Sequence, residues 1–246
     1  ITATINEPVA PVDAYVDDFQ DVSCFGGNDG YASIEATGGS GSFTISWNTT
    51  PAQYGATATG LTAGLWFVTI LDNNGCSTPK LLPVTINGPS APLALTSTIS
   101  DFNGLGISCA NAADGSIQVN TTGGTSGYAF AWSGPNGFSS TSEDNNGLAA
   151  GTYALFVTDA MGCTQDLSVV LTGPAGIAAS AIITTATCGG ASNGAINLTA
   201  TGGIPPYQFA WNGPNGFSAS SEDISGIPAG AYDVIITDAN GCSATF

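Results

Sequence analysis

Hydrophobic and polar residues alternate along short stretches of the chain, with a period of two. Ile117 and Val119 fall on one face of such a stretch, whereas Gln118 and Asn120 fall on the other. This period is typical of half-buried β-strands, because successive side chains of a strand point to opposite faces of the sheet. No segment shows a convincing helical period, so the pattern predicts an all-β chain.

The next predicted strand has aromatic residues at alternating positions. Tyr128, Phe130 and Trp132 are spaced by two, which places them on the same face of a strand. A Thr-Gly-Gly sequence separates this strand from the one before and predicts a turn. We expect the aromatic face to pack in a core, although the same rings could form a platform for stacking sugars. The tryptophans predicted as core residues are Trp47, Trp132 and Trp211.

Aligned on its cysteines, the chain consists of three copies of one pattern. Each copy runs from a cysteine through Asn/Asp-Gly, Thr-Gly-Gly and a tryptophan to a closing Asp-x-x-Gly-Cys sequence. The copies begin at Cys24, Cys109 and Cys188 and close at Cys76, Cys163 and Cys242. Several short strands per copy, with frequent turn signals and an inward tryptophan, predict a tandem array of immunoglobulin-like β-sandwich repeats.

Prolines at short junctions give the expected limits of the repeats. The prediction is repeat 1 at 9–88, repeat 2 at 89–173 and repeat 3 at 174–246, the last lacking its final strand. Residues 1–8 then form the final strand of a preceding or exchanged repeat. We interpret the chain as three repeat lengths cut out of phase from a longer array. The alternative is that Ile1–Asn6 completes the last repeat of another copy by strand exchange.

Short junctions also predict semi-rigid coupling between repeats. Because a strand of six to eight residues is roughly 20–26 Å long, three sandwiches in line would make an elongated rod of about 75–100 Å.

Two disulfide schemes are compatible with the repeats, and cysteine pairing itself indicates an oxidising, exported location. One scheme closes each copy, as Cys24–Cys76, Cys109–Cys163 and Cys188–Cys242; the other joins neighbours, as Cys76–Cys109 and Cys163–Cys188. The spans within copies are 52, 54 and 54 residues, whereas those between copies are 33 and 25. Since a repeated bond should have a repeated span, we predict one disulfide within each repeat, at one pole of the sandwich.

Composition excludes several functions. The chain has one Lys or Arg, 18 Asp or Glu and no His, for a net charge of −17. A single cation cannot neutralise phosphates, which argues against nucleic-acid binding and against docking on an anionic membrane. Histidine catalysis and histidine zinc sites are impossible. No apolar run approaches the length of a membrane span, so direct membrane insertion is not expected, and no motif places a nucleophile, so we expect no enzyme activity.

The combined signature resembles the SprB repeat. In this chain it reads Cys, Asn/Asp-Gly, Thr-Gly-Gly, aromatic-x-apolar-x-Trp, Leu/Ile-x-Ala-Gly-x-aromatic and Asp-x-x-Gly-Cys, and it covers essentially the whole chain three times. The resemblance implies immunoglobulin-like sandwiches in an exported, extracellular surface adhesin of Bacteroidota, displayed as a filament that serves attachment or gliding motility. It implies no catalytic residues. Copy 1 departs from the pattern, because it lacks the Gly-Pro-Asn-Gly-Phe sequence present in copies 2 and 3.

A carbohydrate- or calcium-binding module is the alternative function. Phe138 and Phe217 are candidate ligand-binding residues, because each lies in a Gly/Pro/Asn loop that core packing does not require. We predict no resident metal or cofactor, but calcium prefers several oxygen ligands, and two groups of residues offer them. The first group comprises Asp72, Asp159 and Asp238 with nearby asparagines, and the second comprises Asp13, Asp17, Asp18 and Asp21. Turn formation and a solvated acidic face explain the same residues without calcium. The expected partners are neighbouring repeats or a homopolymer, and a surface or polysaccharide ligand.

Overall fold

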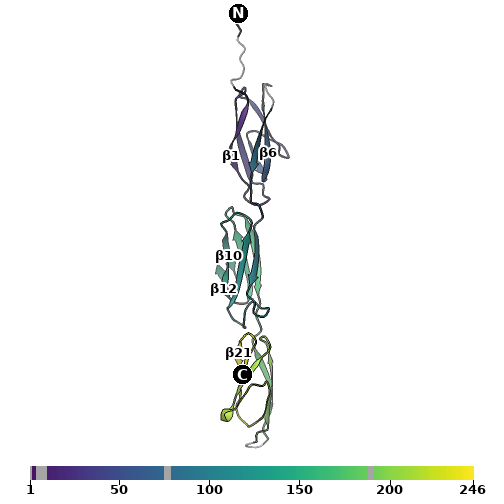
Figure 1. Cartoon of the computed structure of the whole chain (residues 1–246), viewed down its shortest axis with the longest axis vertical. Coiled ribbons are helices and arrows are strands. Elements are labelled where there is room, and N and C mark those ends of the chain that lie inside the picture. Colours follow the sequence, from purple (N-terminus) through teal and green to yellow (C-terminus); the bar gives the residue numbers. More distant parts are fainter. Residues whose placement is uncertain (1, 4–9, 75–78, 188–190) are drawn as a thin grey trace. The chain divides into compact units, whose positions relative to one another are not determined.

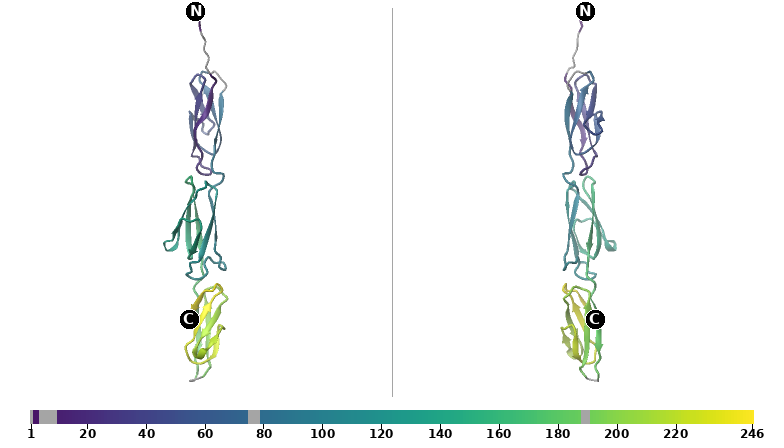
Figure 2. Two further views of the ribbon diagram at one scale, coloured as in Figure 1. Left: turned by 60° about the vertical axis from the view of Figure 1, so that its left-hand side comes forward. Right: turned by 90° about the vertical axis from the view of Figure 1, so that its right-hand side faces the viewer.

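The computed structural model describes residues 2–3, 10–74, 79–187 and 191–246. The segment predicted as a final strand, residues 1–8, falls almost entirely outside the described residues. Across the described part, strands group into six antiparallel sheets, two for each repeat (Figures 1 and 2). The prediction of an all-β, immunoglobulin-like sandwich fold is confirmed.

The first repeat forms a three-stranded sheet, ordered β1-β2-β5, and a four-stranded sheet, ordered β4-β3-β6-β7. Its strands are β1 (Asp13–Gln20), β2 (Gly30–Thr37), β3 (Phe43–Trp47), β4 (Gln53–Tyr54), β5 (Thr57–Leu61), β6 (Gly64–Asp72) and β7 (Lys80–Ile86). Residues of both sheets meet in one core, where Ile34 of the first sheet packs with Trp47 and Val68 of the second. The alternating burial along β2 places its apolar residues in this core, as a period of two requires.

The second and third repeats have the same arrangement, ordered β12-β9-β8 with β11-β10-β13-β14, and β15-β16-β19 with β18-β17-β20-β21. The second contains β8 (Ala94–Ile99), β9 (Gly115–Thr122), β10 (Ala129–Ser133), β11 (Ser139–Ser140), β12 (Asn145–Leu148), β13 (Gly151–Thr158) and β14 (Thr164–Leu171). The third contains β15 (Ala178–Thr184), β16 (Gly194–Thr201), β17 (Gln208–Asn212), β18 (Ser218–Ala219), β19 (Ile224–Ile227), β20 (Asp233–Thr237) and β21 (Ser243–Thr245). Two single 3₁₀ turns, η1 (Pro135–Gly137) and η2 (Pro214–Gly216), precede β11 and β18.

The fourth strand of each repeat shows how the sandwich differs from a constant-type immunoglobulin domain. In that domain the fourth strand joins the first sheet. Here β4, β11 and β18 each pair with the third strand of the repeat and therefore belong to the second sheet. The arrangement leaves a three-stranded sheet facing a four-stranded one.

A hydrogen bond at the start of the sixth strand is typical of immunoglobulin-like sandwiches, where a tyrosine hydroxyl bonds the backbone a few residues upstream. The hydroxyl of Tyr153 donates to the carbonyl of Ala149 at 2.9 Å, and that of Tyr232 donates to Pro228 at 2.9 Å. In the first repeat Trp66 occupies this place, and its indole N–H donates to Thr62 at 3.0 Å. The departure of copy 1 from the sequence pattern therefore preserves the interaction.

By their internal contacts, the described residues form two compact units. The first comprises Ile1–Leu95, Thr121–Ala129 and Val157–Gln165, and the second comprises the remaining residues through Phe246. The boundary passes through the second repeat, so its Thr-Gly-Gly loop and its Asp-x-x-Gly-Cys turn belong to the same unit as the whole first repeat. The predicted repeat limits of 9–88, 89–173 and 174–246 follow the sequence pattern rather than this division, and they stay predictions.

Candidate functional site: disulfide junctions between repeats

The loop that carries the first cysteine of each repeat is held by an Asp or Asn five residues later. The Asp29 carboxylate accepts a hydrogen bond from the Ser23 backbone N–H at 3.0 Å, and Asp114 accepts one from Ser108 at 3.1 Å. In the third repeat Asn193 replaces the aspartate and accepts a bond from the Thr187 N–H at 3.1 Å. The Asn/Asp-Gly motif thus fixes the residue immediately before each first cysteine.

These bonds also favour the ionised form of the aspartates. The Ser108 hydroxyl and backbone N–H both bind the Asp114 carboxylate and hold its pKa below the ordinary value. The pKa of Asp29 is lowered in the same way by the hydroxyl and N–H of Ser23. Both carboxylates are therefore ionised acceptors at neutral pH.

The second cysteine lies on a turn organised by a buried aspartate. In the second repeat, Asp159 Oδ1 accepts hydrogen bonds from the backbone N–H groups of Met161 and Cys163, each at 2.9 Å. Asp238 does the same for Asn240 and Cys242, also at 2.9 Å. The aspartate that opens the Asp-x-x-Gly-Cys motif therefore positions the cysteine that closes it.

The other carboxylate oxygen of this aspartate reaches the loop that follows Thr-Gly-Gly. Asp159 Oδ2 accepts from the Thr125 N–H at 2.8 Å, and Asp238 Oδ2 accepts from Ile204 at 2.9 Å. In the first repeat, Asp72 Oδ2 accepts from the Ser40 N–H at 2.8 Å. One side chain thus joins two loops that are more than thirty residues apart in the sequence.

Both glycines of Thr-Gly-Gly are required for this approach. Gly123 has φ +69°, and a Cβ there would lie 1.9 Å from the Pro92 carbonyl oxygen. Gly124 has φ +60°, and a Cβ would lie 2.6 Å from Asp159 Oδ2. The left-handed backbone and the lack of space both exclude larger residues. The N–H of Gly124 donates to the carbonyl of Ala91 at 3.0 Å, so the same loop also binds the linker that enters the repeat.

The lowered pKa values of Asp72 and Asp159 follow from their hydrogen bonds. Burial raises the pKa of the Asp159 carboxyl, but bonds from the backbone N–H groups of Thr125 and of the Met161–Cys163 turn outweigh it and lower the pKa overall. For Asp72, the Ser40 hydroxyl is the main cause of a lowered pKa. Binding to N–H and O–H donors stabilises the charged form of a carboxylate.

Two disulfides connect the two kinds of loop, and each connects one repeat to the next. Cys24 pairs with Cys163 at a Cα–Cα distance of 5.7 Å, and Cys109 pairs with Cys242 at 5.6 Å. Both distances are usual for a disulfide. The first cysteine of a repeat is therefore bonded to the second cysteine of the following repeat.

The predicted pairing within copies is wrong. Cys24–Cys76, Cys109–Cys163 and Cys188–Cys242 are each excluded, because at least one member of every pair is bonded elsewhere. The alternative pairs Cys76–Cys109 and Cys163–Cys188 are excluded for the same reason. Cys76 and Cys188 themselves lie outside the described residues. The expectation of one disulfide within each repeat is replaced by disulfides between repeats.

The direction of the strands explains the error. In the third repeat Thr187 and Asn193 precede β16, whereas the Asp238 turn, which carries Cys242, binds Ile204 beyond the far end of β16. A strand of eight residues is about 26 Å long, several times the Cα–Cα distance of a disulfide. Thr187 and Asn193 therefore lie at the end of the sandwich opposite to the turn that carries Cys242. The constant spacing of cysteines in the sequence reflects a constant fold rather than a bond.

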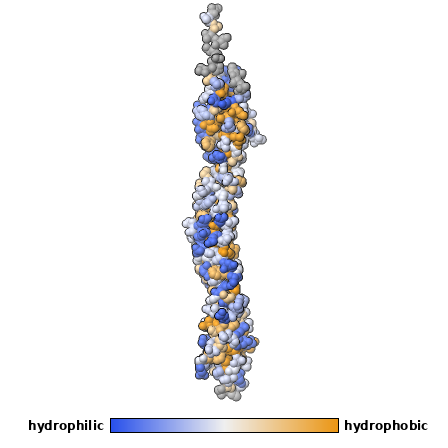
Figure 3. Space-filling model, in the orientation of Figure 1, coloured by the Kyte–Doolittle hydropathy of each residue, from blue (hydrophilic) through white to orange (hydrophobic). Residues whose placement is uncertain are grey.

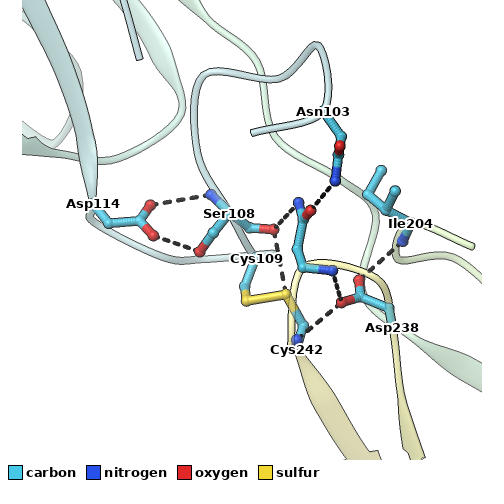
Figure 4. Close-up of a disulfide and its surroundings, with 8 residues drawn as sticks. Asn103, Ser108, Cys109, Asp114, Ile204, Asp238 and Cys242 are labelled. Carbon is cyan, nitrogen blue, oxygen red and sulfur yellow. Dashed lines mark hydrogen bonds between the residues drawn. A yellow bond between two sulfur atoms is a disulfide. The ribbon is translucent and has the colours of Figure 1, made fainter. Parts of the chain in front are cut away.

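The second junction has additional polar contacts beside its disulfide (Figure 4). The Asn240 side-chain amide donates to the Ser108 carbonyl at 3.0 Å, and Asn103 donates to the Asn240 side-chain oxygen. At the first junction Met161 stands where the second has Asn240, so a side-chain amide bond of this kind cannot form there. Both junctions have the disulfide and the aspartate-organised turn, whereas these amide bonds occur at the second junction.

The predicted core tryptophans are buried. Trp47, Trp132 and Trp211 are at most 4% exposed. Each indole N–H finds a backbone carbonyl, and that of Trp132 donates to Ser142 at 2.8 Å. These rings are enclosed in the sandwiches, so they do not form an open platform for stacking sugars.

Phe138 and Phe217, the candidate ligand-binding residues, are half-buried and pack against neighbouring tyrosines. The ring of Phe138 meets Tyr153 edge-to-face at a centroid distance of 5.3 Å, and Phe217 meets Tyr232 at 5.4 Å. This geometry is the favoured arrangement for aromatic pairs. Each phenylalanine covers the tyrosine that bonds the backbone at the start of the sixth strand. A ligand-binding role for these rings stays a prediction.

The candidate calcium-binding residues are mostly engaged with other protein groups. Asp72, Asp159 and Asp238 accept the backbone bonds described above. In the second group, Asp13 forms an ion pair with Lys80 at 2.8 Å, and Asp18 accepts a bond from Tyr31 at 2.6 Å. Among the described residues, no cluster of three or more His, Cys, Asp or Glu has metal-binding geometry.

The surface combines polar side chains with exposed apolar ones (Figure 3). On the first repeat, Leu65 and Leu71 of β6 and Leu81 of β7 are 40–56% exposed. Lys80, the single cation of the chain, lies at the start of β7. In the described part of the chain, no helix is long and apolar enough to cross a membrane.

Tandem immunoglobulin-like sandwiches with covalent junctions define a repetitive module. The SprB repeat matches this module at residues 16–51, 107–137 and 180–216, once in each copy. The three matches are consistent with the SprB-repeat family, as the sequence pattern predicts.

Comparisons with other proteins add distant likenesses. No curated protein matches the chain. Among solved structures, Sidekick-1 immunoglobulin domains 1–5 is similar with a TM-score of 0.39 and 12% identity, over 96% of this chain and 59% of that one. The tetra-tandem repeat in the extending region of a large adhesion protein is similar with a TM-score of 0.29 and 11% identity, over 96% of this chain and 72% of that one. The chain thus spans about three-fifths of the Sidekick-1 structure.

The disulfide assignment can be checked by peptide mapping without reduction. Because the chain has one Lys and no Arg, thermolysin or a protease specific for Asp suits the digestion better than trypsin. We expect peptides in which Cys24 is linked to Cys163 and Cys109 is linked to Cys242. A peptide linking Cys109 to Cys163 would contradict the junctions.

The Asp159 carboxylate should make stability depend on pH. The lowered pKa of Asp159 means that the folded chain binds this proton more weakly than the unfolded chain, whose Asp pKa is about 3.9. Its contribution to the free energy of unfolding is then complete above about pH 5 and is lost as the pH falls through about 4 and below. Replacing Asp159 by Asn should lower the free energy of unfolding at pH 7 by about 1–2 kcal/mol, because one oxygen acceptor becomes a donor. It should also make the melting temperature depend less on pH below about pH 5.

Thermal unfolding followed by circular dichroism between pH 2.5 and 7 measures both effects. Asp17→Asn provides the matched control, because Asp17 is exposed on β1. Equal melting temperatures for Asp159→Asn and the wild-type chain at pH 7 would show that the carboxylate does not hold the turn.

Proposed function

We propose that the chain is a segment of a repetitive cell-surface adhesin or filament, in which linked SprB repeats form a structural stalk for surface attachment or gliding motility. The observation that carries the proposal is the disulfide between consecutive repeats. An isolated binding domain would not need a disulfide to another repeat, whereas in an array such a bond couples neighbouring repeats. The SprB matches support the exported, extracellular setting, in which disulfides persist.

The architecture of each repeat suits a passive role. The candidate calcium-binding carboxylates of Asp72, Asp159 and Asp238 accept backbone hydrogen bonds, and the tryptophans lie in the cores of the sandwiches. The motifs that occur in all three copies are those that form the junctions: Asn/Asp-Gly, Thr-Gly-Gly and Asp-x-x-Gly-Cys. We therefore assign these motifs to linking repeats, with the sandwiches in line as a rod, rather than to a recurring ligand site or to catalysis.

Immunogold electron microscopy of intact cells that produce the protein tests this proposal. Antibodies raised against the oxidised chain should label filamentous material outside the cells, and their Fab fragments should reduce attachment to a surface. Cells lacking the coding sequence provide the control. Labelling that requires permeabilised cells would overturn the assignment to the surface.

A carbohydrate- or calcium-binding module is the second candidate. It is favoured by Phe138 and Phe217, which lie at equivalent positions of two repeats and are not fully buried. Extracellular calcium modules bind with dissociation constants of about 10⁻⁴–10⁻³ M. A binding module should therefore melt at a higher temperature in millimolar calcium than in chelator, because a ligand of the folded state stabilises it.

For the stalk, we expect equal melting temperatures in calcium and in chelator, measured by calorimetry on the oxidised chain. Magnesium at the same ionic strength controls for screening of the net charge. A calcium-specific rise of several degrees would favour the binding module.

A further inference from the structure

The two disulfides form covalent connections that run beside the peptide linkers. Between the first and second repeats, the backbone passes from β7 to β8, while Cys24 and Cys163 make a second connection 139 residues apart in sequence. Between the second and third, the backbone passes from β14 to β15, while Cys109 and Cys242 make a second connection across 133 residues. Each of these junctions therefore has two covalent links.

The two links of a junction are anchored at the same place. At the second junction, Cys242 is bonded through its N–H to Asp238, which also binds the loop after Gly203. The N–H of Gly203 in turn donates to the linker carbonyl of Ala175 at 2.8 Å. At the first junction, Asp159, Gly124 and Ala91 make the corresponding bonds. A pulling force transmitted by the peptide linker or by the disulfide therefore acts on the same end of the following sandwich.

The loops closed by the two disulfides overlap. Cys109 lies within the loop closed by Cys24–Cys163, and Cys163 lies within the loop closed by Cys109–Cys242. The shortest covalent route along the chain therefore crosses from Cys24 to Cys163, runs backwards to Cys109 and crosses again to Cys242. This route contains only a fraction of the peptide bonds between the chain ends.

We propose that the staggered disulfides act as a covalent bypass for tension, so that forced unfolding of the repeats releases only a small part of their chain length. The route through the bypass contains about 80 residues, which at roughly 3.4 Å per residue corresponds to about 280 Å, whereas the reduced chain extends to about 830 Å. The bypass follows from the pairing alone and goes beyond the proposed surface role. Its test therefore stands whether or not the chain is a stalk.

Because the two disulfide loops overlap, breaking one bond and breaking both change the contour length in a pattern that disulfides within single repeats cannot produce. Breaking one of the two bonds lengthens the shortest route by only about 25–30 residues, or roughly 85–105 Å, because the other bond still shortens it. Breaking both adds about 160 residues, or roughly 550 Å. Independent bonds closing separate repeats would instead add similar lengths one by one.

Single-molecule force spectroscopy on the full chain measures these lengths. The chain is held between handles attached to its ends without cysteine chemistry, in a background where Cys76→Ser and Cys188→Ser leave only the two described bonds. Three variants are compared with this background: Cys24→Ser with Cys163→Ser, Cys109→Ser with Cys242→Ser, and all four substitutions together. The readout is the contour length of the fully extended chain.

We expect small increases for each two-cysteine variant and an increase several times their sum for the four-cysteine variant. Adding a reductant to the background chain should reproduce the four-cysteine result. Because contour length is read from the extended chain, a loss of native stability in a variant does not obscure it. Additive increases, or equal lengths in oxidised and reduced chains, would overturn the bypass. Failure of surface labelling would leave this result untouched, so the two proposals fail separately.

Discussion

One carboxylate per repeat holds together the parts of the fold on which each junction depends. In the second repeat, Asp159 binds the loop after Thr-Gly-Gly with one oxygen and the turn carrying Cys163 with the other. The same loop binds the linker from the preceding repeat through Gly124. The core could form without this arrangement, because its strands are specified by alternating apolar residues. The aspartate instead determines where the cysteine and the linker lie at the pole of the sandwich.

This dependence explains why glycine is so frequent at fixed positions. A side chain at Gly123 or Gly124 would collide with the linker carbonyl or with the Asp159 carboxylate, and both residues have positive φ. Two glycines, one aspartate and one cysteine therefore form a single structural unit, although they are distributed over about forty residues of sequence, from Gly123 to Cys163.

The sequence predicts the elements of the fold well because each element has a local cause. Alternation predicts the strand containing Ile117, aromatic spacing predicts the burial of Trp132, and Asp-x-x-Gly-Cys predicts a tight turn. The partner of a cysteine has no such local cause. Constant spacing between Cys109 and Cys163 shows only that the same structure separates them.

A signal for the correct pairing was nevertheless present in the pattern. Between the positions of the two cysteines of a repeat the chain passes through an odd number of strands, as the five strands β2–β6 of the first repeat illustrate. An odd number of antiparallel strands ends at the pole opposite to the one where it began. Counting strands therefore separates Cys109 from Cys163, whereas counting residues does not. Each of these two cysteines is bonded to a cysteine of a neighbouring repeat.

The staggered pairing also has a consequence for how such arrays change over generations. The second repeat contributes its first cysteine, Cys109, to one bond and its second, Cys163, to another. A whole repeat of this kind inserted between two others therefore supplies both partners that the insertion requires. Loss of a whole repeat likewise brings two complementary cysteines together. Recombination in units of one repeat can then alter the length of the gene product while leaving the oxidative folding of every interior repeat intact.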